Sequence, residues 1–325
     1  MKLDGMAMEK TTGLATAPLG KSGITVPIMG FGSAPVAGLY RPLDDDAAIE
    51  TIRFALAQGI FLFDTAPLYG AGRAEALIGR AMEGVPRDHY LISTKVGRLL
   101  DPAHGSLTFD FSRDGVLRSL EGSLQRLKTD RVDILHIHDP DNHQEQALAE
   151  AFPTLVELRS QGVVRAIGAG MNQWEALAKF AHFGDFDCFL LAGRYTLLEQ
   201  GALRFLDLCR EKGIGILLGG VFNSGILATG AVPGARHNYR EAHQDILTRV
   251  AAIEEICERH WVQLNAAALQ FAKAHPAVSS LVIGAASPDE IRANLEALAA
   301  PIPAAFWAEL RAQGMLDPAA PLPST

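Results

Sequence analysis

GIFLFDTAPLYGAGRAEALIGRAMEGVPRDHYLISTK, residues 59–95, contains one complete unit of the pattern that decides the fold. Its first part, GIFLFD (59–64), is a short apolar run typical of a buried strand. AEALIGRAMEG (74–84) follows as a helix, and HYLISTK (89–95) is a second apolar strand. A strand, a helix and another strand in this order predict a β-α-β unit, in which the two strands run parallel.

Strand-like and helix-like runs alternate in the same way over most of the chain. The predicted strands are ITVPIMGFG (24–32), GIFLFD (59–64), HYLISTK (89–95), VDILHIH (132–138), VVRAIGAG (163–170), DCFLLAG (187–193), GIGILLGG (213–220) and SSLVIGA (279–285). The predicted helices cover residues 44–58, 74–84, 112–127, about 144–161, 174–182, 199–212, about 242–260, 263–274 and 288–298.

Eight strand–helix units favour a closed (β/α)8 TIM barrel over an open doubly wound sheet. A length of 325 residues suits one such barrel with added loops, and no boundary between two domains is visible. We therefore expect a single barrel domain over residues 18–316. An N-terminal extension over residues 1–17 and a C-terminal tail over residues 317–325 complete the chain.

Loops and helix ends carry further signals. Gly59, Gly162 and Gly213 follow predicted helices and are expected to end them. Residues 223–239 form the longest stretch without a periodic pattern, which predicts a lid or a binding loop. In barrels of this kind the chemistry lies at the carboxyl ends of the strands, so the residues that follow each strand are the candidates for a site.

Composition narrows the classes of function. The net charge is −8 and no basic cluster occurs, which argues against nucleic-acid or anionic-membrane binding. The three cysteines, Cys188, Cys209 and Cys257, are far apart and fit neither a disulfide framework nor a zinc spacing. No apolar run reaches the roughly 18 residues of a membrane span, and residues 1–20 lack a signal-peptide pattern. We expect a cytoplasmic protein.

Four ionisable residues follow the second, third and fourth strands: Asp64, Tyr69, Lys95 and His138. Taken singly, such an Asp often caps a helix, a Tyr packs and a Lys is solvated. Together at the mouth of a barrel they favour catalysis. A lysine cation lowers the pKa of a nearby tyrosine, which is ordinarily about 10. Asp64 would hold Lys95, and His138 would orient the reacting oxygen.

The motifs FDTAPLYGAGRAE, ISTKVG, VDILHIHDP and AIGAGMN, in this order, resemble the aldo-keto reductases over about residues 18–298. The likeness is strongest to the sugar-dehydrogenase branch of D-threo-aldose (L-fucose) 1-dehydrogenases, with pyridoxal 4-dehydrogenases nearby. The resemblance implies that Tyr69 is the general acid and base and that Lys95 lowers its pKa. It implies that Asp64 supports Lys95 and that His138 orients the substrate oxygen.

The resemblance also implies a nicotinamide cofactor bound by loops after the later strands. Asn172 matches the carboxamide-binding Asn of the family, although capping of the next helix is an alternative role. The family's carboxamide-binding Gln is replaced by Ala192, and Tyr195 either lines the pocket or packs. The turn GGVFNSGIL resembles the one that holds the pyrophosphate. Its candidates are Phe222, Asn223, Ser224, Gly225 and Leu227.

VIGAASPDEIRANL, after the last strand, matches the family's adenosine-phosphate motif. Ser287 is expected to cap the helix, and Asn294 matches the adenine-contacting Asn. NADP-preferring relatives carry Lys and Arg where this chain has Gly284 and Glu290, and a 2′-phosphate requires a cation. Arg292 lies two positions from Glu290 and faces elsewhere on the helix. We therefore expect NAD in preference to NADP.

The substrate side departs from many relatives, because Asp139 stands where they have Trp after the catalytic His. A carboxylate there suits a polyhydroxylated substrate, although capping or solvation explains it equally well. With the resemblance it favours oxidation of an aldose at C1 to a lactone. Pyridoxal oxidation and general aldehyde or ketone reduction remain alternatives. Leu39, Tyr40 and Arg41, and residues 236–239, are candidates for the pocket entrance.

Three other readings remain open. His136 and His138 share a strand face and suggest a metal-dependent hydrolase. A metal needs three or four ligands, so His136 is predicted to lie inside the barrel and no metal is expected. Lys95 suggests a class I aldolase that forms a Schiff base. A cofactor-sensing subunit without activity is the third reading. Whether the protein is a monomer or a homo-oligomer is left open.

Overall fold

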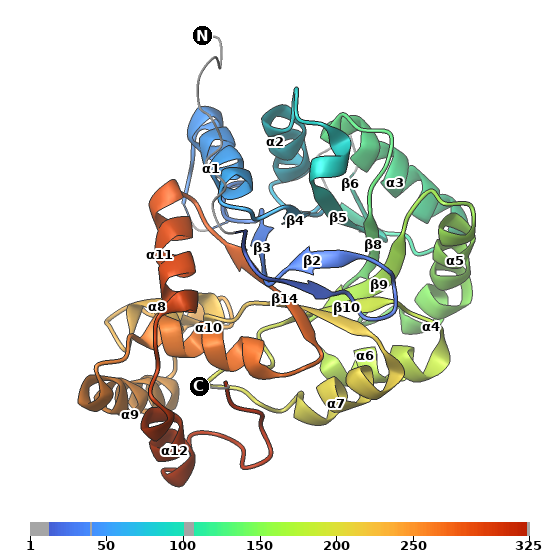
Figure 1. Ribbon diagram of the computed structural model, residues 1–325. Helices are drawn as coiled ribbons and strands as arrows, with labels where there is room; N and C mark the ends of the chain where they lie inside the picture. Colours follow the sequence, from blue (N-terminus) through green and yellow to red (C-terminus); the bar gives the residue numbers. More distant parts are fainter. Residues whose placement is uncertain (1–12, 40, 101–106, 324–325) are drawn as a thin grey trace.

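A closed barrel of eight parallel strands forms the centre of the computed structural model, which describes residues 13–39, 41–100 and 107–323 (Figure 1). Neighbouring strands follow chain order, and β14 closes the barrel on β3. The strands are β3 (Met29–Gly32), β4 (Leu62–Asp64), β5 (Leu91–Val96), β8 (Ile134–His138), β9 (Ala166–Met171), β10 (Cys188–Ala192), β11 (Gly215–Gly219) and β14 (Val278–Gly284). The predicted TIM barrel is confirmed.

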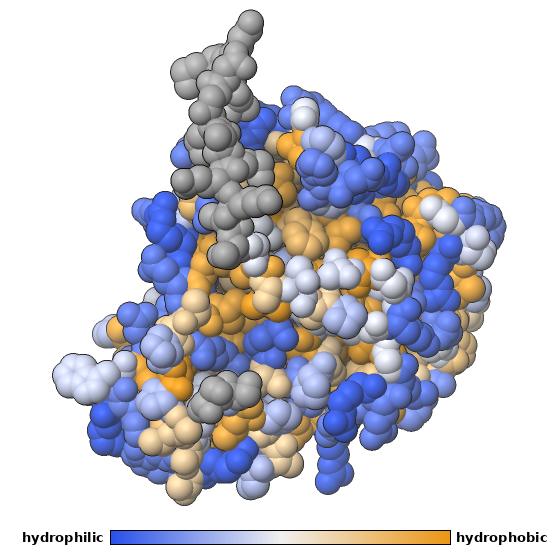
Figure 2. Space-filling view, viewed as in Figure 1, coloured by the Kyte–Doolittle hydropathy of each residue, from blue (hydrophilic) through white to orange (hydrophobic). Residues whose placement is uncertain are grey.

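Helices surround the barrel, and the longer ones pack buried apolar residues against the strands. The helices of this ring are α1 (Asp45–Ala57), α2 (Arg73–Ala81), α3 (Arg113–Leu127), α4 (Gln144–Gln146), α5 (Phe152–Ser160), α6 (Trp174–Phe183), α7 (Leu203–Lys212), α10 (Leu264–Ala274) and α11 (Pro288–Ala299). α9 (Gln244–His260) and α12 (Ala304–Ala312) pack against one another outside the ring (Figure 1). Polar and charged residues cover much of the outer surface (Figure 2).

The predicted ends of several helices are confirmed by their caps. Ser112 precedes α3, and its hydroxyl accepts a hydrogen bond from the Gly115 N–H at 3.1 Å. Gly59, Gly162 and Gly213 have φ values of +83°, +74° and +67°, a left-handed conformation in which glycine ends a helix without a Cβ penalty. Among the described residues, no helix is long and apolar enough to span a membrane.

The prediction of one strand over residues 24–32 is wrong. The segment divides at Pro27, whose ring supplies no N–H for a central ladder. β2 (Thr25–Pro27) instead forms an antiparallel hairpin with β1 (Thr16–Pro18), and only β3 joins the barrel. Leu19, Ile24 and Val26 pack against the first residues of several barrel strands. The hairpin therefore closes the amino end of the barrel, across which it lies in Figure 1.

The predicted helix over residues 144–161 is continuous in the chain but not in its hydrogen bonding. A π-helical turn, Ala147–Ala151, separates α4 from α5. Pro153 lies in the first turn of α5, where it has no N–H to donate to the preceding turn. The wider turn before it accommodates the missing donor.

The loop predicted over residues 223–239 contains structure. It begins with a 3₁₀ turn at Asn223–Gly225 and α8 (Ile226–Thr229), and then forms a small hairpin of β12 (Arg236–His237) and β13 (Arg240–Glu241). A second hairpin, β6 (Arg98–Leu100) with β7 (Leu107–Phe109), follows β5 and was not predicted. Both hairpins follow the carboxyl ends of barrel strands, where the candidate site residues also lie.

Candidate active site

A buried ion pair links the ends of two neighbouring strands. The parallel register of β4 and β5 sets Asp64 opposite Ser93. Lys95 lies two residues further along β5, on the same face of the strand. Lys95 Nζ donates to Asp64 Oδ2 at 2.7 Å, and Ser93 Oγ donates to Asp64 Oδ1 at 2.8 Å. Lys95 also donates to the Thr65 carbonyl at 2.8 Å. Both charges are therefore fixed by hydrogen bonds, and their side chains are only 1% and 3% exposed.

Lys95 keeps its charge in this setting. Burial lowers the pKa of Lys95, but Asp64 and Tyr69 outweigh it and raise the pKa above the ordinary value for lysine. A Schiff base needs a neutral amine. An amine held as a cation against Asp64 is therefore poorly suited to class I aldolase chemistry.

Tyr69 and His138 complete a group of four with this pair. Lys95 Nζ lies 4.7 Å from the centroid of the Tyr69 ring. The rings of Tyr69 and His138 meet edge to face, with centroids 6.1 Å apart and an angle of 89° between their planes. The structure thus brings together all four residues that the sequence singled out.

The pKa of Tyr69 shows two opposing influences. Burial raises it above its usual value, and the cation of Lys95 lowers it, as the sequence predicted. Burial has the larger effect in the free protein, so the net direction of the pKa of Tyr69 is upward. Tyr69 is therefore a neutral phenol near neutral pH, ready to donate a proton. Lys95 limits the rise caused by burial.

His138 is a neutral imidazole for a related reason. Burial lowers its pKa well below the usual value, and the cations of Lys95 and Arg98 lower it further. Its Nδ1 atom has no hydrogen-bond partner among the described residues. His136 is fully buried in β8 and lies on the same strand face as His138, which lines the cavity, so it lies inside the barrel as predicted. Within residues 13–39, 41–100 and 107–323, no group of three His, Cys, Asp or Glu side chains is arranged to hold a metal ion.

Asp139 is neither a helix cap nor a fully solvated residue. Arg98 of β6 donates to Asp139 Oδ2 at 2.6 Å, and their side chains are only 21% and 28% exposed. Burial raises the pKa of Asp139, whereas Arg98 lowers it. Its backbone φ of +42° turns the chain sharply after His138. Arg98 was missed by the sequence analysis, because a single Arg after a strand carries no motif.

These groups face a cavity of about 460 Å³ at the mouth of the barrel. Tyr69, Lys95 and His138 lie on its wall together with Asp139 and Asn172. The remaining wall is largely apolar and comes from loops after several strands: Ala34, Ala37, Leu39, Leu68, Met171, Leu190, Ala192 and Tyr239. Tyr40, another substrate candidate, lies outside the described residues.

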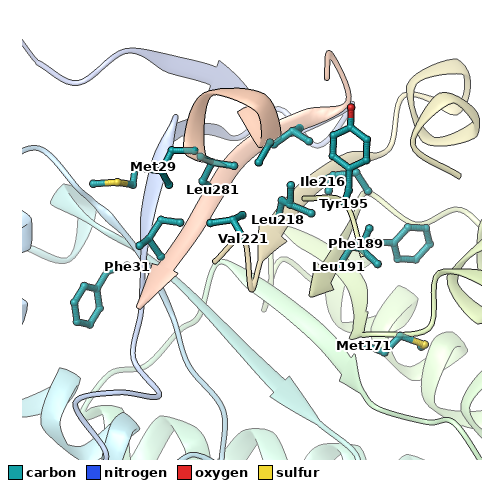
Figure 3. Packing of buried hydrophobic residues seen from close by; sticks show 14 of the residues in the cluster. Met29, Phe31, Met171, Phe189, Leu191, Tyr195, Ile216, Leu218, Val221 and Leu281 are labelled. Atoms are coloured by element: carbon teal, nitrogen blue, oxygen red, sulfur yellow. The ribbon is translucent and has the colours of Figure 1, made fainter. Parts of the chain in front are cut away.

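Asn172 does not cap the following helix. The N-cap of α6 is Gln173, and no side chain makes the capping hydrogen bond. Asn172 Nδ2 instead donates to the Ala192 carbonyl at 2.9 Å, which holds the amide at the cavity wall. Tyr195 is fully buried and stacks on Phe271 with ring centroids 5.2 Å apart. It lies among the packed side chains in Figure 3 and is a core residue.

The turn after β11 divides its five candidates into two groups. Asn223 and Leu227 are buried, and the Asn223 amide binds the Gly193 carbonyl and Thr196 Oγ1. Their side chains therefore make contacts within the protein and are not exposed to a ligand. Phe222, Ser224 and Gly225 remain partly accessible. A Cβ on Gly225 would meet nothing within 4 Å, so this turn offers bare backbone that suits an anionic oxygen.

The start of α11 carries the predicted cap. Ser287 Oγ accepts from the Glu290 N–H at 3.3 Å, and Glu290 Oε2 accepts from the Ala286 N–H at 2.8 Å. Glu290 Oε1 accepts from Arg41 at 3.0 Å, a contact that sequence reasoning missed because Arg41 lies 249 positions away. Asn294 is half-buried on the same helix.

Two further observations concern the charge at this helix. A Cβ on Gly284 would lie 2.6 Å from Pro35 Cγ, so a larger side chain there would collide with the loop after β3. Arg292 pairs with Asp289 and lies over the Phe54 ring, which confirms that it faces away from Glu290. The open backbone turn after β11 and the capped start of α11, which follows β14, both fit a dinucleotide.

Comparisons with known proteins agree with this geometry. The model of the Aldo/keto reductase family matches residues 28–314. A pyridoxal 4-dehydrogenase from Microbacterium luteolum is 39% identical, over 92% of this chain and 97% of its own length. A D-threo-aldose 1-dehydrogenase from a Pseudomonas species is also 39% identical, over 89% of this chain and 94% of its own length. An aldo-keto reductase from Bacillus halodurans shares the fold, with a TM-score of 0.79, 24% identity and coverage of 94% and 98%.

Proposed function

The chain belongs to the Aldo/keto reductase family and is an oxidoreductase that acts on alcohol or carbonyl groups with a nicotinamide cofactor. From this premise we propose that it oxidises an aldose of the D-threo type, such as L-fucose, at C1 to a lactone, with NAD⁺. The names of two relatives, each 39% identical, point to sugar or pyridoxal oxidation. Pyridoxal is therefore the second candidate substrate.

The observation that carries the proposal is Asp139. This carboxylate lines the cavity next to His138 and is held by Arg98. A sugar presents several hydroxyl donors around its reacting carbon, and a shielded carboxylate is a strong acceptor for them. A simple aldehyde has no hydroxyls to satisfy this group.

The side chains of the site suit proton transfer at one oxygen. Asn172, the turn after β11 and the start of α11 would hold the cofactor, whose oxidised nicotinamide would supply the hydride acceptor for C1. Tyr69 takes the proton of the anomeric hydroxyl, and with the loss of this proton and of the C1 hydride the lactone C=O bond forms. Lys95, fixed by Asp64, stabilises the phenolate before this transfer. His138, as a neutral donor, hydrogen-bonds the same sugar oxygen and holds it between the His138 and Tyr69 side chains. Reduction of a carbonyl runs the same transfers in reverse.

Two features of the α11 start support NAD. Glu290 places a carboxylate where a 2′-phosphate would need a cation, and Gly284 cannot be replaced by Lys without moving Pro35. Arg41 is a cation at the same place, but its guanidinium is paired with Glu290. The pair presents little net charge to a phosphate, and a carboxylate oxygen can accept from ribose hydroxyls.

A substrate panel tests this function. Purified protein is assayed with NAD⁺ and NADP⁺ against L-fucose, other aldoses and pyridoxal, and in reverse against small aldehydes. We expect the highest kcat/KM with L-fucose-type aldoses and NAD⁺. An Asp139→Asn variant, which keeps the shape but removes the charge, should lower kcat/KM for the sugar by about tenfold. Activity confined to open-chain aldehydes, or unchanged by this substitution, would contradict the proposal.

A further inference from the structure

Two of the exposed apolar side chains share one cavity. Leu39 is 50% exposed and Tyr239 is 57% exposed, and both line the cavity that contains Tyr69 and His138. They arrive from the loops after β3 and β11, the first and seventh strands of the barrel. Single exposed apolar residues are common on protein surfaces. A pair that faces one polar site offers apolar contact to whatever enters it.

Tyr239 occupies a backbone position that a tyrosine rarely adopts. Asn238 and Tyr239 form the turn between β12 and β13, with φ values of +49° and +66°. Such a turn normally has glycine at its second position, because a bulky side chain is disfavoured in the left-handed region. Residues held in this region cluster at functional sites, although Lys128 and Trp261 adopt it at helix ends. The turn delivers the aromatic ring to the cavity wall.

A network centred on Glu199 holds this hairpin in place. Glu199 Oε1 accepts from Asn238 Nδ2 at 3.2 Å and lies 2.9 Å from His237 Nε2. Arg194 donates to Glu199 Oε2 at 3.2 Å and to Asn238 Oδ1 at 3.0 Å. Glu199 and Arg194 belong to the loop after β10, so the network ties the hairpin to the neighbouring strand.

A second anchor lies beside the ring. The Tyr239 N–H donates to Ser224 Oγ at 2.9 Å, which fixes the hairpin to the turn after β11. The Asn223 amide of that turn also donates to Glu199 Oε1, at 3.4 Å. The position of the Tyr239 ring therefore depends on Glu199, which does not line the cavity itself.

We propose that Tyr239 and Leu39 clamp the ring of a cyclic substrate, and that Glu199 is the positioning residue for this clamp. A pyranose has an apolar face of C–H groups and an edge of hydroxyls. The face matches the Tyr239 ring, and the edge matches the Asp139 carboxylate, which lines the same cavity. The clamp selects cyclic substrates, whether pyranose or pyridine ring, over small open-chain carbonyls. This inference rests on the proposed function, which places the reacting carbon of the substrate beside Tyr69.

The test compares kcat and KM for three probes: L-fucose and pyridoxal, each oxidised with NAD⁺, and methylglyoxal, reduced with NADH. Tyr239→Ala should lower kcat/KM for the two cyclic probes by about tenfold, mainly through KM, because ring contacts of this kind carry about that factor. It should leave methylglyoxal within about twofold. Tyr239→Phe retains the ring and should keep the cyclic activity. Val232→Ala is the matched control: Val232 is 45% exposed in the same loop and does not line the cavity.

Glu199→Ala tests the positioning role. It should raise KM for the cyclic probes and increase hydrogen exchange in residues 236–241, and Glu199→Gln should restore part of both. Equal losses for all three probes in Tyr239→Ala, or no loss, would overturn the clamp. If the wild type oxidises no aldose, the proposed function fails. The clamp is then tested by whether Tyr239→Ala lowers the ratio of pyridoxal to methylglyoxal activity. A wild type that accepts only methylglyoxal overturns both.

Discussion

The proposed acid–base half of the barrel mouth and its proposed cofactor half are built from different parts of the chain. At the ends of β4, β5 and β8, the working groups are buried side chains, and Lys95 is fixed by Asp64 at 2.7 Å. At the end of β11, the accessible surface is an open backbone turn, and the side chains of Asn223 and Leu227 are turned inward. Substitutions should therefore lower activity strongly in the acid–base half and by varying amounts in the cofactor half.

Tyr69→Phe should have the largest effect and defines the acid–base half. The substitution removes only the hydroxyl, so packing beside His138 is kept while proton transfer is lost. We expect kcat to fall by about 10²- to 10⁴-fold, the usual contribution of a general acid or base. The affinity for NAD⁺, measured by calorimetry, should be unchanged. A variant with wild-type kcat would show that another group transfers the proton.

Lys95→Met should have the next largest effect, this time on stability as well. It leaves the Asp64 carboxylate buried without its cation, which typically costs about 3–5 kcal/mol of unfolding free energy. Urea denaturation measures this loss. The double variant Asp64→Asn/Lys95→Met removes both charges and should recover much of it. If the double variant is less stable than the single one by a further similar amount, the two side chains do not act as a pair.

The contrast between the halves also explains what the sequence could predict. Asp64, Tyr69, Lys95 and His138 were predictable because their residue types define a chemistry and the parallel strands bring their ends together. Asn223 and Leu227 were assigned by motif, and the motif does not say whether a side chain points outward. The ion pairs of Arg41 with Glu290 and of Arg98 with Asp139 were missed, because long-range ion pairs leave no local pattern. The barrel was predicted, but the breaks at Pro27 and Pro153 were not. The hairpins β6–β7 and β12–β13 were also missed, because strands of two or three residues are too short to show a periodic pattern.

Glu290→Arg should have a moderate effect in the cofactor half. It replaces the carboxylate near Arg41 with a second cation, which a 2′-phosphate can bind. We expect the Kd for NADP⁺ to fall by about tenfold relative to that for NAD⁺. Arg292→Ala is the matched control, because Arg292 pairs with Asp289 and lies over Phe54. Because Arg292→Ala removes a cation, a clear shift of its preference away from NADP⁺ would mean that general charge, not this position, sets the preference.

Arg41→Ala should have the smallest effect on stability. Its pair with Glu290 is an ion pair like that of Lys95 and Asp64, but the two side chains are 58% and 47% exposed. Exposed pairs contribute about 0–1 kcal/mol because solvent screens them. Urea denaturation under the conditions used for Lys95→Met makes the comparison direct. A loss as large as that of Lys95→Met would remove the distinction between the two halves.

The pH dependence of sugar oxidation tests the central claim, that the Lys95 cation controls the proton of Tyr69. Oxidation needs the phenolate, and burial raises the pKa of Tyr69, so kcat/KM should rise with pH toward the alkaline range. In a folded Lys95→Met variant the midpoint should move upward by about one pH unit or more, because the opposing cation is gone. The account predicts this displacement. Superimposable pH profiles for the two proteins would contradict it.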